Sequence, residues 1–390
     1  MELLAPAGDL ERAKVALLYG ADAVYLGGTK FSLRARASNF TLEDIGDIVL
    51  FAHERGKKVY VTTNIVAHEE DLSELDDYLH ALDSLGVDAI IASSPIIIDR
   101  ASKTTSLDIH LSTQVSVANA EGVLFWASLG VTRVVLAREC SMEEISSIAH
   151  QVSTELEVFV HGGMCVSYSG RCTLSNLLSA RDANRGGCAH SCRWNYTLLH
   201  EHQPVSDHPD FQMASTDLNG IHQVPELMRA GVASLKIEGR MKSVHYVATV
   251  VDAYRRRIDD TFAGIIRDDS EYDQWISRAE NRPTSAGFLS DTKADKRQIY
   301  HLRSEAVTQE YLGIVRQAEE QGFWLEVRNH FRVGDTVEIF SPGKDRYEMQ
   351  VSSLQDELGN ELDVARHPKQ LLFIPCQHPV SPYDMLRKVF

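Results

Sequence analysis

Eight short apolar runs occupy residues 1–260 of this 390-residue chain. Each run is rich in β-branched residues and lacks strict alternation of apolar and polar positions, which is typical of strands buried on both faces of a parallel sheet. Helical patterns follow most of the runs, and one of them opens with the capping box Ser141-x-x-Glu144. The runs are residues 2–6, 23–27, 58–62, 88–92, 108–112, 133–137, 157–161 and 234–238.

Eight strands in a repeating strand–helix order are what a (β/α)8 barrel of the TIM type requires, and such barrels run to about 250 residues. A doubly wound open sheet is the alternative fold of the α/β class. The number of runs and the lack of a glycine-rich dinucleotide turn favour the barrel, which we place at residues 1–262. In such a barrel the catalytic residues lie where the strands end.

Three further regions follow from the same pattern. Residues 162–230 separate the seventh and eighth predicted strands, so we expect an insertion that lies over the active face. Residues 263–305 are polar and interrupted by Pro283 and Gly287, which predicts a linker. Residues 306–390 change to short strands separated by turns, which indicates a small all-β barrel domain.

The excess of acidic over basic residues limits which partners the protein can bind. Acidic residues outnumber basic ones by 55 to 39, giving a formal net charge of −16. A broad phosphate-binding surface is therefore not expected, because nucleic-acid affinity depends on Lys and Arg displacing counterions. The chain has no signal-peptide pattern and no apolar run long enough to cross a bilayer, so we expect a cytoplasmic protein with no membrane partner and with reduced thiols.

Four of the six cysteines fall in the predicted insertion, at Cys165, Cys172, Cys188 and Cys192. Four thiols in one short segment can hold an iron–sulfur cluster or a tetrahedral zinc ion. Only the second pair has the spacing of a zinc knuckle, and the whole pattern lacks the compact run of bacterial ferredoxins. Spacing alone therefore leaves the cluster, zinc and plain reduced thiols open.

Arginines accompany the cysteines. Arg171, Arg181, Arg185 and Arg193 occur with one acid, Asp182, between positions 165 and 195. Such arginines can offset the negative charge of a cluster or hold a carboxylate or phosphate group. A merely solubilising role on the surface is the alternative.

Polar residues stand at the predicted strand ends. Lys236, Glu238 and Arg240 end the eighth strand and suit the binding of a dicarboxylate, although an ion-pair network that closes the barrel is an equal alternative. Arg138 follows the sixth strand and His161 ends the seventh. The remaining candidates for orienting a substrate are Asn64 and the run Ser112, Thr113 and Gln114.

The stretch from His161 to Cys172, with the sequence HGGMCVSYSGRC, closely resembles the signature of the collagenase-like peptidase family U32. The similarity covers nearly the whole chain. It continues through residues 4–8, 181–186, 188–194, 217–219, 236–242 and 281–288.

The resemblance implies oxygen-independent hydroxylation supported by a [4Fe–4S] cluster on the four cysteines, with zinc as the alternative. The uninterrupted C-x3-C pair and the C-terminal β-domain resemble the branch that makes 5-hydroxyuridine in tRNA, with prephenate or a related carboxylate as the hydroxyl donor. We therefore expect tRNA and a small carboxylate as partners, and leave a paralogous partner subunit open. His161 and Glu238 are the catalytic candidates, and the substrate-binding candidates are Arg138, Arg171, Arg181, Arg185, Lys236 and Arg240.

Two alternatives stay open. The first is a peptidase whose cysteines are structural or bound to zinc, since His161 lies four residues before Cys165. The chain has no Gly-x-Ser-x-Gly or His-Glu-x-x-His motif, and a Cys–His pair would leave three thiols without a role. The second alternative is a hydroxylase that acts on ribosomal RNA or on a quinone precursor.

Overall fold

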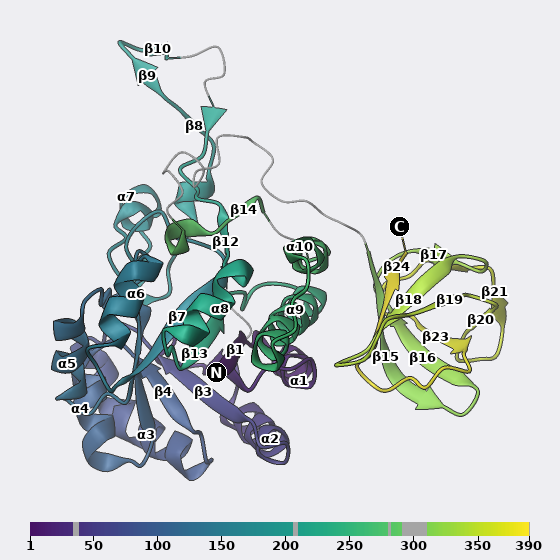
Figure 1. Cartoon of the computed structure of the whole chain (residues 1–390), viewed down its shortest axis with the longest axis horizontal. Coiled ribbons are helices and arrows are strands. Elements are labelled where there is room, and N and C mark those ends of the chain that lie inside the picture. The colour runs from purple at the N-terminus through teal and green to yellow at the C-terminus, as the bar shows by residue number, and fades with distance from the viewer. Residues whose placement is uncertain (34–38, 206–209, 280–281, 291–309, 390) are drawn as a thin grey trace.

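The computed structural model describes residues 1–33, 39–205, 210–279, 282–290 and 310–389. Eight parallel strands form a closed barrel, because β13 pairs with β1 on one side and with β7 on the other. Helices surround this barrel (Figure 1). The predicted (β/α)8 fold is confirmed. The barrel strands are β1 (Glu2–Pro6), β2 (Ala23–Gly27), β3 (Lys58–Thr63), β4 (Ala89–Ala92), β5 (Asp108–Leu111), β6 (Arg133–Val135), β7 (Glu155–Gly162) and β13 (Ser234–Ile237).

The surrounding helices begin where the sequence provides caps. Ser141 accepts a hydrogen bond from the backbone of Glu144, and the Glu144 carboxylate accepts one from the backbone of Ser141, so the predicted capping box is confirmed. None of the described helices is long and apolar enough for a membrane span. The helices are α1 (Leu10–Leu18), α2 (Leu42–His53), α3 (Leu75–Ser84), α4 (Pro95–Thr104), α5 (Ala120–Ala127), α6 (Met142–Ala149), α8 (Val224–Arg229) and α9 (Val244–Ala263).

The insertion between β7 and β13 rises above one end of the barrel (Figure 1). It holds α7 (Leu174–Ser179), two short 3-10 turns at Ala183–Arg185 and Ser191–Arg193, and a projecting arm with β8 (Tyr196–Thr197), β9 (Leu199–His200), β10 (Gln203–Pro204) and β11 (Asp210–Phe211). It returns through β12 (Asp217–Asn219), which pairs antiparallel with the end of β7. This pairing fixes the insertion to the rim of the barrel.

Two segments of the predicted linker, residues 269–277 and 284–285, form secondary structure. Helix α10 (Asp269–Ser277) packs against α9 through the buried side chains of Tyr272 and Ile276. Strand β14 (Thr284–Ser285) pairs with β12. In the sequence these two apolar residues are surrounded by the polar residues of the exposed face of α10, so the pattern does not indicate a packed helix. Residues 291–305 of the predicted linker lie outside the described residues.

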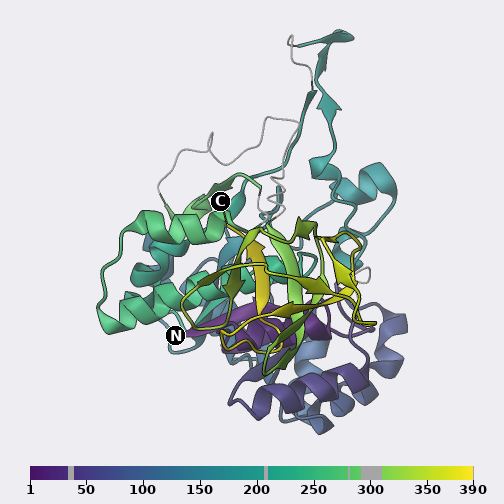
Figure 2. The same ribbon diagram turned by 90° about the vertical axis from the view of Figure 1, so that its right-hand side faces the viewer.

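The C-terminal domain is antiparallel and curls around its own apolar core as a half-barrel (Figure 2). The Tyr19 hydroxyl donates to the backbone carbonyl of Phe340 at 2.8 Å, and Arg278 pairs with Glu338 at 2.9 Å, so this domain is anchored to the barrel. The strands are β15 (Tyr311–Glu319), β16 (Gly322–Val327), β17 (Phe331–Arg332), β18 (Thr336–Phe340), β19 (Tyr347–Gln350), β20 (Leu354–Gln355), β21 (Glu361–Leu362), β22 (Val364–Ala365), β23 (Leu371–Pro375) and β24 (Met385–Lys388).

The barrel interior contains a charged layer. The Arg133 guanidinium lies 2.6 Å from a Glu2 oxygen and 3.4 Å from Glu157, and Lys236 Nζ lies 2.7 Å from the other Glu157 oxygen. Burial alone would raise the pKa of Glu2, but the charge and hydrogen bond of Arg133 outweigh burial and lower it. These four side chains thus neutralise one another in the interior.

We expect Arg133→Met to lower the free energy of unfolding by about 3–5 kcal/mol, because it leaves buried carboxylates without their partner. Lys103→Met is the matched control, since it removes an exposed ion pair with Asp99 and should cost at most about 1 kcal/mol. Urea denaturation followed by circular dichroism measures both. Equal denaturation midpoints for Arg133→Met and the wild type would contradict the structural role of this layer.

Candidate active site

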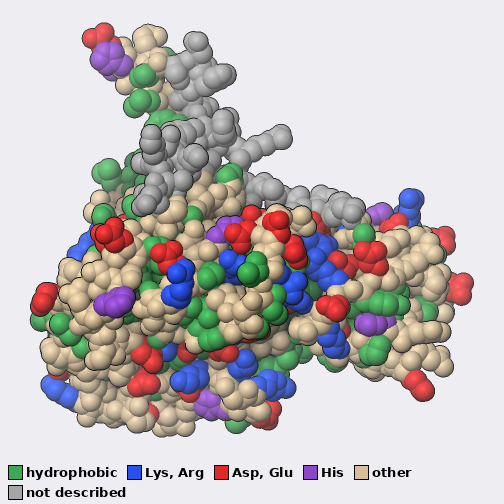
Figure 3. Space-filling view, in the orientation of Figure 1, with side chains coloured by type: hydrophobic (Ala, Val, Ile, Leu, Met, Phe, Trp, Pro, Cys, Tyr) green, Lys and Arg blue, Asp and Glu red, His purple; other side chains and the backbone are tan. Residues whose placement is uncertain are grey.

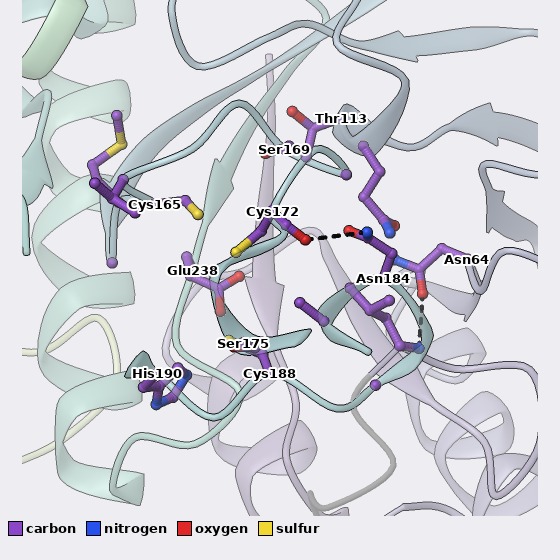
Figure 4. A pocket seen from close by; sticks show the side chains of 18 of the residues that line it. Asn64, Thr113, Cys165, Ser169, Cys172, Ser175, Asn184, Cys188, His190 and Glu238 are labelled. Atoms are coloured by element: carbon purple, nitrogen blue, oxygen red, sulfur yellow. Dashed lines mark hydrogen bonds between the residues drawn. The ribbon is translucent and has the colours of Figure 1, made fainter. Parts of the chain in front are cut away.

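A cavity of about 490 Å³ opens at the carboxyl ends of the barrel strands, beneath the insertion (Figure 4). Both the strand ends and the insertion contribute to its wall, as the sequence predicts for an insertion over the active face. The polar and charged side chains that line it include Asn64, Ser112, Thr113, Gln114, Arg138, Arg181, Asn184, Arg193, Lys236, Glu238 and Arg240, together with four cysteines.

Two glycines allow the chain segments that form the cavity walls to approach each other closely. Gly162, at the end of β7, has a φ of +100°, and a Cβ atom there would lie 2.3 Å from the backbone carbonyl oxygen of Glu238. Gly170, in the insertion, has a φ of +73°, and its Cβ atom would lie 2.3 Å from the carbonyl oxygen of Gln114. No other residue type tolerates both this conformation and this contact.

The four thiols of Cys165, Cys172, Cys188 and Cys192 all line the cavity. The side chains of Cys165, Cys172 and Cys188 point into the same space as the Glu238 carboxylate (Figure 4). Burial raises the pKa of Cys165 and of Cys192, and the neighbouring thiols raise both further against the opposing charges of nearby arginines. The structure therefore brings the four predicted ligands together.

The four thiols match the ligands of a [4Fe–4S] cluster in number and type, since such a cluster is held by four cysteine thiolates. A structural zinc ion needs its ligands to converge on one tetrahedral point. Among the described residues, no group of three or more His, Cys, Asp or Glu side chains is arranged to hold a metal ion.

Glu238 is held at the cavity by two groups. The Tyr25 hydroxyl donates to its carboxylate at 3.0 Å, and the Arg138 guanidinium lies 3.9 Å from the same oxygen, Oε2. Arg138 also donates to the carbonyl of Gly163 at 3.3 Å and stacks on the ring of Phe159. Tyr25 and Phe159 were not among the predicted site residues, because inward-facing aromatic positions of buried strands carry no distinguishing pattern.

Lys236 combines both roles that the sequence left open, since it lines the cavity while its ammonium binds the buried Glu157. Arg240 also lines the cavity, and it donates to the hydroxyl of Ser32 at 3.2 Å. Among the described residues, five cationic side chains and one carboxylate, that of Glu238, line the cavity.

The insertion arginines occupy different places. Arg181 and Arg193 line the cavity, and burial together with the charge of Arg282 lowers the pKa of Arg193. Arg185 is not among the lining residues, because its guanidinium binds the carbonyl of Val66 at 2.7 Å. It also binds Asp71 at 2.8 Å, and so fastens the insertion to the barrel. Arg171 is exposed and lies outside the cavity lining.

His161 does not line the cavity. Its side chain is buried, its Nδ1 atom lies 3.3 Å from the Tyr254 hydroxyl, and its ring also contacts that of Tyr246. Both tyrosines belong to α9, outside the barrel sheet. Alternation along β7 therefore directs His161 away from the cavity, whose lining includes a different histidine, His190.

Comparisons with known proteins agree with the motif. The family model described as Peptidase family U32 matches residues 8–299, and that of the Peptidase family U32 C-terminal domain matches residues 307–387. A tRNA hydroxylation protein of Bacillus subtilis is 43% identical over 99% of this chain and 94% of its own length. A tRNA hydroxylation protein of Escherichia coli is 33% identical over 100% of this chain and 97% of its own. A collagenase of Porphyromonas gingivalis is 29% identical over 99% and 97%.

We expect Arg185→Ala to loosen the insertion, because the contacts of Arg185 with Val66 and Asp71 join it to the barrel. Limited proteolysis should then cut between residues 163 and 193 faster than in the wild type, while the thermal midpoint of the whole protein changes little. Arg171→Ala is the control, since Arg171 belongs to the same insertion but is exposed. Equal cleavage rates for the two variants would contradict this fastening role.

Proposed function

The chain belongs to peptidase family U32, and from that membership and the site we propose that it is an RNA hydroxylase, which forms 5-hydroxyuridine at the wobble position of tRNA without using oxygen. The main observation that supports this proposal is that, among the described residues, four thiols and five cationic side chains line one cavity at the carboxyl ends of the barrel strands. The names of the relatives from Bacillus subtilis and Escherichia coli supply the reaction class.

The four cysteines would hold a [4Fe–4S] cluster, which supplies electron transfer to the cavity when bound. Arg138 and Arg240, with Lys236 below them, are suited to bind the carboxylates of a small donor such as prephenate. Glu238 faces the same space, and Tyr25 holds its Oε2 atom. The Glu238 carboxylate would accept a proton from a substrate bound in this cavity, which the insertion covers.

Because the protein is acidic, the proposed RNA substrate would have to bind at a limited region of the surface where cationic side chains are concentrated. The net charge is −16, and acidic and basic side chains are interspersed over the face shown in Figure 3. The cationic groups that line the cavity, Arg181 and Arg193 among them, provide a local exception. Affinity for tRNA is therefore expected to be modest and to fall as salt is added.

A peptidase is the second candidate, since the family description and the collagenase of Porphyromonas gingivalis point to it. His161 is directed toward α9, so a cysteine nucleophile at the cavity would need another histidine as its base, and His190 lines the cavity. Purified holo-protein incubated with gelatin should release no peptides above a buffer control. Cleavage that Cys165→Ala abolishes without unfolding the protein would support the peptidase instead.

For the cluster, we expect anaerobically reconstituted protein to contain about four irons per chain, and Cys172→Ala to lose most of this iron because it removes one of four thiolate ligands. Cys140→Ala is the matched control, because Cys140 is buried and lies outside the cavity lining. Iron analysis and the absorbance spectrum measure both. Stoichiometric zinc without iron, or iron retained in Cys172→Ala, would contradict the proposed cluster.

For the reaction, we expect tRNA from a deletion strain to lack 5-hydroxyuridine and its derivatives. Mass spectrometry of nucleosides measures this, and a plasmid carrying the wild-type gene should restore the modification, whereas a plasmid carrying Cys172→Ala should not. The host must lack an oxygen-dependent enzyme that makes the same nucleoside. An unchanged nucleoside profile in such a host would refute the proposed reaction.

A further inference from the structure

Three large apolar side chains that line the cavity are exposed to solvent: those of Val166, Tyr168 and Met241. Their exposed fractions are 40%, 56% and 60%. A single exposed apolar residue is common on a protein surface, whereas several that border one cavity indicate contact with a ligand or partner. We call these three side chains the apolar rim.

The apolar rim borders the cavity from two sides. Val166 and Tyr168 belong to the insertion, and Met241 follows β13. The hydroxyl of Ser116, shortly after β5, donates to the carbonyl of Ser169 at 2.9 Å, so the segment that carries Tyr168 lies next to the end of β5. Two strands, β6 and β7, separate β5 from β13 around the barrel.

The backbone at Tyr168 is fixed while its ring is left without a partner. Its carbonyl accepts from the backbone N–H of Arg171 at 3.1 Å, and the next carbonyl is held by Ser116. Among the described residues, no other ring or cation packs on the Tyr168 ring, and its hydroxyl makes no hydrogen bond. A flat ligand that packs on this ring therefore pays little for ordering the backbone.

The apolar rim and the cations below it differ in depth. Lys236 and Arg240 are buried, so a small carboxylate bound to them would lie inside the cavity. A ligand that also covers the exposed rim extends toward solvent, as part of a larger molecule would. A cationic cavity bordered by an exposed aromatic ring suits a single-stranded nucleic acid, whose phosphates pair with cations while its bases stack on aromatic side chains.

We propose that the face of an unpaired RNA base stacks on the ring of Tyr168, with Val166 and Met241 packed around it. Stacking uses the flat face that every base has, so this contact does not choose between bases. It excludes bases inside a helix, because neighbouring base pairs cover their faces. The inference rests on the proposed function, and it adds how the cavity would recognise single-stranded RNA and which side chain does so.

The test compares an RNA hairpin with the same hairpin carrying abasic sites in its loop, which keeps the phosphates and removes the bases. Anaerobically purified protein should bind the intact hairpin roughly tenfold more tightly than the abasic one. Fluorescence anisotropy at a fixed salt concentration measures both affinities, since the phosphate contribution depends on salt.

Three variants locate the contact. Tyr168→Ala should bind the intact hairpin roughly tenfold more weakly than the wild type, bind the abasic hairpin unchanged, and keep its iron. Tyr168→Phe keeps the ring and should bind both hairpins as the wild type does. Phe125→Ala is the matched control, because Phe125 is an exposed ring on α5 that lies outside the cavity lining, and it should change neither affinity.

Two results would overturn the inference while tRNA hydroxylation could stand: equal binding of both hairpins by the wild type, or an undiminished preference for the intact hairpin in Tyr168→Ala. Should Tyr168→Ala lose its iron, Tyr168→Leu takes its place, since it keeps an apolar side chain without the ring and should also lose the preference. A protein that neither binds nor modifies RNA fails the proposed function itself.

Discussion

Closure of the barrel is the constraint on which the site depends. Because β13 pairs with both β1 and β7, the chain on either side of the insertion returns to adjacent strands. The pairing of Lys236 with Phe159, and of Ile237 with His161, brings the end of the eighth strand against the start of the cysteine segment. Glu238 and Arg240 therefore lie at the same rim as Cys165, although more than seventy residues separate them along the chain. An open sheet would have left these two segments apart.

The same closure explains how charged groups can be buried below the cavity. Lys236 contributes to the cavity wall and also neutralises Glu157, which in turn contacts Arg133. A buried ion pair of this kind is weak evidence for stability, because desolvation offsets much of the attraction. Its consequence here is positional: the Lys236 ammonium cannot move without leaving the Glu157 carboxylate unpaired in the interior. The base of the cavity is thereby held in one arrangement.

The sequence predicts the elements better than the directions of their side chains. The eight strands, the insertion and the convergence of four cysteines all follow from apolar runs and from spacing. By contrast, whether His161 faces the cavity or α9 depends on the pleat of β7, and whether Arg185 binds RNA or Asp71 depends on where the insertion folds back. The sequence predicts a linker where α10 lies, because its two buried side chains, Tyr272 and Ile276, are surrounded by polar residues. Asn184 carries no signal in the sequence, since only the fold brings it beside Asn64.

Under the proposed function, the groups that bind the RNA phosphates and the groups that choose the base must be different ones. At a net charge of −16 the protein as a whole repels RNA phosphates at long range, so under the proposed function a tRNA would be held where cationic side chains are concentrated. Inside the cavity the five cationic groups favour any anion equally and cannot tell one base from another. Discrimination between bases would therefore need hydrogen-bonding groups with a defined direction, and side-chain amides are among the groups that line the cavity. Phosphates and carboxylates would then be bound by charge, and the base would be selected by hydrogen-bond geometry.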